Sequence, residues 1–266
     1  ILTQGVSYDS SRPYGLFVQQ LRRSFSVEET ESPEALRDKI DSALPSQPSE
    51  SRASVVEAVA HLLSPASDPV EPHLDGEAVK RQMFEALLGV WRRMPSPTVF
   101  VAEDIHWADP ASIELLTHLS QLVEEVPIVF LCAFRPEREA PSWQVKVAAE
   151  THYPRAHIEL DIDALSAEES SELFGNLLSV ADLPDRVRET VLARADGNPL
   201  FVEEFTRSLI DTGAVTPHGG GAHWHADANV EQTAIPENLQ ALLTARIDRL
   251  DEGARRTLQL CSVMGR

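Results

Sequence analysis

The sequence has 266 residues, of which 42% are hydrophobic, and a formal net charge of −19. A chain of this length can bury a sizeable core, and typical domain sizes of about 100–200 residues predict two domains. A surface this acidic repels phosphate backbones and anionic headgroups, so we expect no nucleic-acid or membrane binding by these residues.

Cysteine usage and hydropathy bear on the compartment. Cys132 and Cys261 lie in apolar segments far apart in the sequence, a pattern typical of small core residues in a reducing environment. No apolar run reaches the roughly 18 residues that a membrane helix needs, and no signal peptide is recognisable. These features predict a cytoplasmic protein. The sequence begins with Ile1 rather than Met, which suggests a fragment.

The first third of the chain contains predicted structural elements but no catalytic motif. Residues 26–70 are rich in Ser, Pro and Glu, so most of this stretch is expected to be solvated connections. The predicted elements are a strand within 1–6, a turn at 7–11, a helix over 13–25, short helices from Ser32 and over 53–63, and a stronger helix that Asp75 caps and Pro95 stops.

The stretch from Thr98 to Pro110 is the most informative. Five uncharged residues, Thr98–Ala102, lead directly to Glu103 and Asp104. A short apolar run without polar alternation predicts a strand buried on both faces in a parallel sheet, where functional groups follow the carboxyl ends of strands. One acid at that position can hold Mg²⁺ while the second orients a nucleophilic water.

A structural role is the alternative for these two acids. They could cap the next helix, but Asp109 and Pro110 already provide a good N-cap and a good first helical residue. Apolar residues at helical spacing follow, and then Ile128–Ala133 predicts a second buried strand that ends just before Arg135. This order, strand, helix and strand, predicts a right-handed parallel crossover.

The segment Glu103–Pro110, which reads Glu-Asp-Ile-His-Trp-Ala-Asp-Pro, resembles the Walker B region of the STAND ATPases, a branch close to AAA+. It is most similar to bacterial regulators in which the ATPase is joined to LuxR-type DNA-binding, cyclase or protein-kinase domains. The resemblance implies a P-loop NTPase core that uses ATP and Mg²⁺. Glu103 departs from the Asp that is commoner at the first acidic position.

Beyond Ala133 the pattern becomes helical after one further candidate strand at Ala156–Leu160. Ser166 and Glu169 form a predicted capping box. Gly197-Asn198-Pro199 can be explained as a helix boundary, with Gly ending one helix and Asn-Pro starting the next. The resemblance adds a second role, because this motif is similar to the family's lid motif, in which Gly197 and Pro199 would contact ATP, the proline against the adenine.

A loose hairpin is predicted around Gly219–Gly221. His218, His223 and His225 could suggest a zinc site, but the regular Cys or acidic ligand spacing is missing, so a solvated loop is favoured. Helices follow from Ile235. They resemble the start of a winged-helix domain, so the predicted division is an α/β core over 1–160, an all-α lid domain over 161–234 and a winged-helix beginning over 235–266.

A P-loop motif is missing from the sequence. Its lysines are Lys39, Lys80 and Lys146, and none follows a glycine or precedes Ser or Thr. The resemblance places the P-loop upstream of Ile1, so residues 1–266 alone are expected to bind ATP weakly. A strand beside the Walker B strand is expected to be missing as well. The open edge would expose Val99, Val101, Val129 and Leu131 and favour self-association.

The resemblance implies an ATP-binding, slowly hydrolysing regulatory switch that works together with other domains of a larger protein. Glu103 would serve Mg²⁺, Asp104 would polarise the attacking water, and Arg135 would report the γ-phosphate, unless Arg135 only forms a surface ion pair with Glu137 or Glu139. A non-catalytic, nucleotide-clamped interaction module stays open as the alternative. A DNA-binding regulator is disfavoured by the negative charge.

Overall fold

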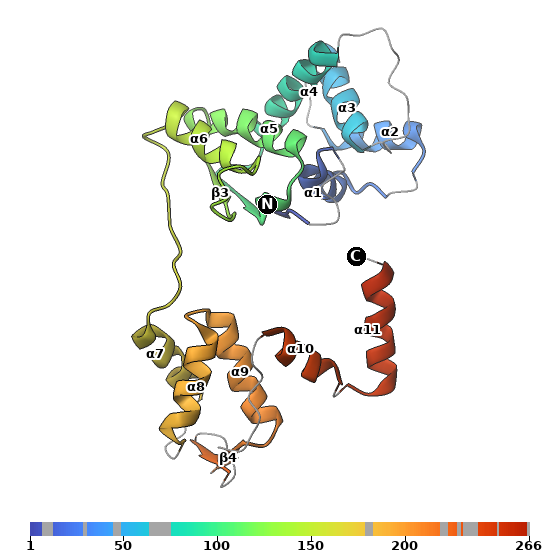
Figure 1. The fold of residues 1–266 in the computed structure, drawn as a ribbon. Coiled ribbons are helices and arrows are strands. Elements are labelled where there is room, and N and C mark those ends of the chain that lie inside the picture. The colour runs from blue at the N-terminus through green and yellow to red at the C-terminus, as the bar shows by residue number, and fades with distance from the viewer. Residues whose placement is uncertain are drawn as a thin grey trace. The chain divides into compact units, whose positions relative to one another are not determined.

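The structure is a computed structural model of the chain. It describes residues 1–6, 13–28, 31–44, 49–63, 76–178, 183–218, 223–227, 230, 239–248 and 250–264. The chain divides into two compact units, Ile1–Glu159 and Leu160–Arg266, and each is described by itself (Figure 1). In the described part, no helix is long and apolar enough to span a membrane.

The first unit is an α/β unit with a small parallel sheet. Its strands are β1 (Leu2–Gln4), β2 (Thr98–Glu103) and β3 (Ile128–Cys132). Its α-helices are α1 (Gly15–Phe25), α2 (Pro33–Ala43), α3 (Ser49–Leu63), α4 (Gly76–Trp91), α5 (Pro110–Leu119) and α6 (Trp143–His152). Two 3₁₀ turns, η1 (Ile105–Trp107) and η2 (Ser120–Glu124), flank α5.

The sheet has the order β1-β2-β3, and both pairings are parallel. β1 pairs with β2 through Leu2–Val101, Thr3–Ala102 and Gln4–Glu103. The expectation that β2 lacks a neighbouring strand is therefore wrong, because β2 has a partner on each side. The short run at the start of the sequence supplies that partner, as its predicted strand character allows.

The helices lie on one side of the sheet (Figure 1). Strand order equals chain order, so right-handed crossovers that advance in one direction place every connecting helix on the same face. Phe100 and Ala102 point into that layer and are buried, whereas Val99, Val129 and Leu131 on the opposite face are 51%, 57% and 51% exposed. Val99, Val129 and Leu131 are exposed as predicted, whereas Val101 is only partly exposed, and the exposure arises at an open face rather than at an open edge. The prediction that β2 is buried on both faces is wrong.

Aromatic rings fix the helices against the covered face. Phe100 of β2 stacks on Phe17 of α1 with 6.0 Å between ring centroids, and it meets Trp91 of α4 edge-on at 4.8 Å. All three side chains are fully buried. Each such pair adds about 0.5–1.5 kcal/mol beyond the burial of area, so this trio joins α1 and α4 to the sheet.

The candidate strand at Ala156–Leu160 is not a strand in the structure. Its backbone has no regular structure, and Ile158 and Leu160 are 82% and 76% exposed. The alternation of apolar and polar residues fits a strand, but a strand forms only where a neighbour supplies its hydrogen bonds, and no described strand pairs with this segment. Local pattern alone therefore does not determine its conformation.

The second unit contains a small helical bundle and a hairpin. Its elements are α7 (Ala167–Leu177), α8 (Asp185–Ala195), α9 (Pro199–Asp211), β4 (Val215–His218), β5 (His223–Ala226), α10 (Leu239–Asp248) and α11 (Glu252–Met264). Phe174, Val191 and Phe205 are buried at the centre of α7, α8 and α9. The Ser166–Glu169 capping box and the antiparallel hairpin are both confirmed.

Some predictions concern residues outside the described part of the chain. These are the turn at 7–11, the Asp75 cap, the Gly219–Gly221 loop and the start of a helix at Ile235. The lid and winged-helix domains stay predictions. Cys261 is exposed, so its prediction as a core residue is wrong, whereas Cys132 is partly buried against the core.

Candidate functional site

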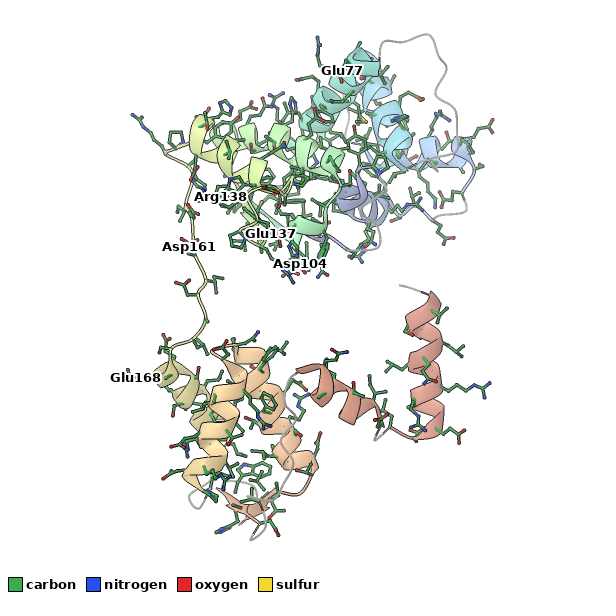
Figure 2. The ribbon with its side chains drawn as sticks, viewed as in Figure 1. Glu77, Asp104, Glu137, Arg138, Asp161 and Glu168 are labelled. Carbon is green, nitrogen blue, oxygen red and sulfur yellow. The ribbon has the colours of Figure 1, made fainter. Side chains whose placement is uncertain are left out.

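The two acids lie where β2 ends. Glu103 is the last residue of the strand and is exposed, on the same side of the sheet as Val99 and Val101. Asp104 then adopts a left-handed backbone conformation, with φ 51° and ψ 34°, and begins η1. In Figure 2, Asp104 lies at the edge of the first unit that faces away from α2, α3 and α4. The strand end and the turn thus present adjacent carboxylates at one edge of the sheet.

A neighbouring strand contributes a residue that sequence reasoning missed. Gln4, at the carboxyl end of β1, is the register partner of Glu103, and its Nε2 donates a 2.8 Å hydrogen bond to Oδ2 of Asp104. The signal in the sequence was a polar residue at the end of the first strand. The role of this residue follows only from the strand order, which places β1 beside β2.

Gly5 allows β1 to run this close to the acidic turn. Its N–H donates to the carbonyl of Glu103 at 2.8 Å. A Cβ atom on Gly5 would lie 2.4 Å from the carbonyl oxygen of Asp104 and 3.2 Å from the amide nitrogen of Ala108. Because real side chains never approach backbone this closely, the backbone around Asp104 requires glycine at this position.

Asp109 organises the same edge of the sheet as a buried cap. As predicted, it caps α5, with Oδ1 accepting from the N–H of Ser112 at 2.9 Å. It also caps α1, which the sequence did not predict, because its two oxygens accept from the N–H groups of Tyr14 and Gly15 at 3.0 Å each. One carboxylate, only 4% exposed, therefore binds two helix N-termini together.

Arg135 lies beyond the end of β3 and faces an aromatic ring. The N–H of Ile105 donates to the carbonyl of Ala133 at 3.1 Å, which ties the start of η1 to the chain that leads to Arg135. The guanidinium carbon of Arg135 is 5.9 Å from the ring centroid of Trp107. Within the described residues, no carboxylate lies within ion-pair distance of Arg135.

The donor set at this edge suits a magnesium ion. Mg²⁺ prefers hard oxygen ligands and usually takes one or two carboxylates together with phosphate oxygens and water. Glu103 is exposed, and Oδ1 of Asp104 accepts no hydrogen bond from a described residue. Oxygen donors are therefore accessible, and the residues present fit this ion.

The second unit holds Gly197 and Pro199. Gly197 has φ +74°, and a Cβ atom there would lie 2.4 Å from the carbonyl oxygen of Leu165. Asn198 caps α9 by accepting from the N–H of Leu200 at 3.0 Å, and Pro199 is the first residue of that helix. The helix-boundary role of the motif is confirmed. Pro199 is exposed, and its contact with adenine stays a prediction.

The histidines of the hairpin do not define a metal centre in the described part. His218 and His223 are register partners in the hairpin, but their side chains lie outside the described residues, and so does the zinc alternative that involves them. Among the side chains that the structure describes, no group of three or more His, Cys, Asp or Glu residues is placed to hold a metal ion.

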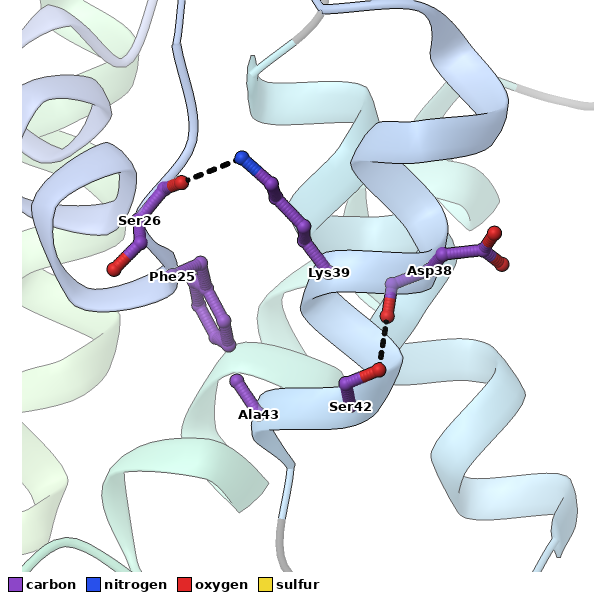
Figure 3. A pocket seen from close by; sticks show the side chains of 6 residues that line it. All are labelled: Phe25, Ser26, Asp38, Lys39, Ser42 and Ala43. Atoms are coloured by element: carbon purple, nitrogen blue, oxygen red, sulfur yellow. Dashed lines mark hydrogen bonds between the residues drawn. The ribbon is translucent and has the colours of Figure 1, made fainter.

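A shallow hollow of about 420 Å³ lies elsewhere on the first unit, between the end of α1 and α2 (Figure 3). Lys39 crosses it and donates to the carbonyl of Ser26 at 3.0 Å, besides its ion pair with Glu31. Asp109 holds the other end of α1, about 16 Å away for an 11-residue helix. The hollow is therefore separate from the acidic edge.

Comparison with known proteins agrees with this geometry. Residues 1–132 match the family model described as AAA ATPase domain, and residues 166–223 match one described as a domain of unknown function (DUF8739). An uncharacterized protein of Rhizobium meliloti (strain 1021) is 26% identical over 204 residues, or 73% of this chain. The chain spans only 18% of the length of that relative.

Among solved structures, the fold is similar to a Thermotoga maritima RuvB mutant, with 14% identity and a TM-score of 0.35 over 96% of this chain and 79% of that one. A likeness this weak supports no conclusion by itself. The family match covers β1, β2, the acidic pair and β3, which are the elements that build the edge described above. The first 132 residues of this chain are therefore an AAA ATPase-like domain.

Proposed function

We propose that this chain is the ATP-dependent switch module of a multidomain signalling or transcriptional regulator of the STAND type. The observation that carries the proposal is the acidic pair at the carboxyl end of β2, within an AAA ATPase-like domain. Bound Mg²⁺ would neutralise charge that develops on the phosphate oxygens. Glu103 would hold the ion, and Asp104 would orient and polarise the attacking water.

Two further groups would contact the nucleotide. Arg135 follows β3 beside the acidic turn, where its guanidinium could address the γ-phosphate. Pro199, at the exposed start of α9, would lie against the adenine, and Gly197 next to it would contribute to the ATP site. The state of the phosphate would then be passed to other domains of the same protein.

The decisive experiment compares chemistry with binding in the full-length protein that carries this sequence. Asp104→Asn keeps the shape of the side chain but removes its charge. We expect it to lower kcat by about 10²-fold or more while ATP affinity changes little. Asp161→Asn, the same change on a residue outside the helices and strands, is the control. Equal losses of kcat and affinity at Asp104 would remove it from the chemistry.

A specific observation favours a second function, a nucleotide clamp that does not turn over. One oxygen of Asp104 is occupied by the amide of Gln4, which restrains the carboxylate that should act on water. In a clamp, ATP would stabilise the closed form without hydrolysis. Single-turnover measurement of phosphate release separates the two functions, because a clamp releases phosphate no faster than ATP in buffer.

A further inference from the structure

Trp107 is a large aromatic residue in an unusual position. It lies in η1, three residues after Asp104, and it is 41% exposed instead of buried in the core. Its indole contacts two side chains, the guanidinium of Arg135 at 5.9 Å and the imidazole of His106 at 4.9 Å between ring centroids. The indole therefore contacts side chains at the acidic edge and packs little against the core.

Backbone hydrogen bonds hold together the two segments that carry Trp107 and Arg135. Ala133, the residue after β3, donates to the carbonyl of Ala102 at 2.9 Å and accepts from the N–H of Ile105 at 3.1 Å. Ile105 is fully buried, and its side chain anchors η1 in the core. Trp107 and Arg135 therefore extend from two segments that are bonded to each other, and each is two residues from that junction.

Arg135 has competing partners close in sequence. Glu137 and Glu139 are both exposed and carry the opposite charge, yet no ion pair to Arg135 exists among the described residues. The two kinds of contact leave the arginine in different states. An ion pair uses the N–H donors of the guanidinium, whereas a cation–π contact requires none of them, so the donors stay available for phosphate oxygens.

We infer that Trp107 is a positioning residue for Arg135. Its indole holds the guanidinium at the carboxyl edge of the sheet and keeps it from Glu137 and Glu139, with its donors unused until an anionic phosphoryl group arrives. This inference rests on the proposed function, because it assigns Arg135 a phosphoryl ligand. In this role Trp107 would act through Arg135 alone.

A spectroscopic test addresses the contact without ATP. The Nε–Hε NMR resonance of Arg135 in the 266-residue chain should carry a ring-current shift from Trp107. Trp107→Ala should abolish that shift, and Trp107→Phe should retain part of it. Trp143, whose ring lies 5.8 Å from the guanidinium carbon of Arg138, provides the matched control, since Trp143→Phe should leave the Arg135 resonance unchanged. An Arg135 resonance that Trp107→Ala does not move overturns the inference.

A double-mutant cycle in the full-length protein addresses the consequence. Trp107→Ala should lower kcat about two- to fivefold, the effect of losing an exposed cation–π contact. Trp107→Phe should recover most of that loss. In the Arg135→Ala background the Trp107 substitution should have no further effect. An equal further loss there would overturn the inference. If the unmutated protein does not hydrolyse ATP, the proposed function fails, and the NMR test still decides the role of Trp107.

Discussion

The side chain of Gln4 donates a 2.8 Å hydrogen bond to Oδ2 of Asp104, across 100 residues of sequence. This contact joins the carboxyl end of β1 to the turn that carries the second acid, and it occupies one of the two oxygens that could act on water. The resting position of Asp104 is therefore set by a neighbouring strand. A change in β1 would be transmitted directly to the acidic edge.

Gln4→Leu removes the donor and keeps a side chain of similar size. A hydrogen bond of this kind contributes about 1 kcal/mol, so we expect single-turnover phosphate release in the full-length protein to rise about fivefold, with ATP affinity unchanged. Gln144→Leu, at an exposed position of α6, is the control. A slower release in Gln4→Leu would mean that Gln4 holds Asp104 in the productive orientation.

Much of the fold could be predicted from local sequence chemistry. Helix starts with an oxygen cap, such as Ser32, Asp109 and Ser166, lie where the sequence placed them. The segment Ala156–Leu160 shows the limit of this reasoning. Its alternation predicts a strand, but pairing depends on which strand lies alongside, and that relationship is not encoded in the segment itself.

In the candidate site, too, local signals could be predicted from the sequence, whereas contacts between distant segments could not. The pair Glu103 and Asp104 could be found because adjacent acids after an apolar strand are a local signal. The contacts that position them could not, because Gln4 and Asp104 meet only through the order of the strands. The contact of Arg135 with Trp107 likewise depends on how β3 and η1 are joined, whereas the sequence suggested a γ-phosphate contact for Arg135, with an ion pair as the alternative.

Asp109 is expected to be critical for stability. Its carboxylate is buried and accepts from the backbone N–H groups of Tyr14, Gly15 and Ser112. Asp109→Ala would leave these donors without their partner, so we expect a loss of about 3 kcal/mol in the free energy of unfolding. Urea denaturation followed by circular dichroism measures this. Asp109→Asn retains one acceptor oxygen and should lose less; equal losses would contradict the double-capping role.

Burial of Cys132 makes stability depend on alkaline pH. Desolvation raises the pKa of its thiol from 9.0 to about 11, because the partly buried site disfavours the thiolate. Its contribution to stability is therefore present below pH 9 and is lost as the pH rises toward 11. Urea denaturation across this range should show a loss in the wild-type protein that Cys132→Ala lacks. If both proteins lose stability equally, other groups control the alkaline limit.

The uncovered face of the sheet is the surface from which we expect self-association. Leu2, Val101 and Leu131 form one row across the three strands, and Val99 and Val129 form a second. Contiguous exposed apolar surface of this kind favours contact with a second surface. Leu131→Lys should weaken self-association of the chain about tenfold, as expected for about 1.4 kcal/mol of lost apolar burial. Sedimentation velocity over a concentration series measures it.

The positive charge of the introduced lysine separates the apolar contribution to self-association from the electrostatic one. The chain has a net charge of −19, so an added lysine reduces the repulsion between copies and by itself favours association. A decrease in association must therefore come from the loss of apolar contact at the face. Leu260→Lys is the matched control, because Leu260 is similarly exposed, at 58%, on α11 of the other unit. If Leu260→Lys weakens association as much as Leu131→Lys does, the face of the sheet is not the contact surface.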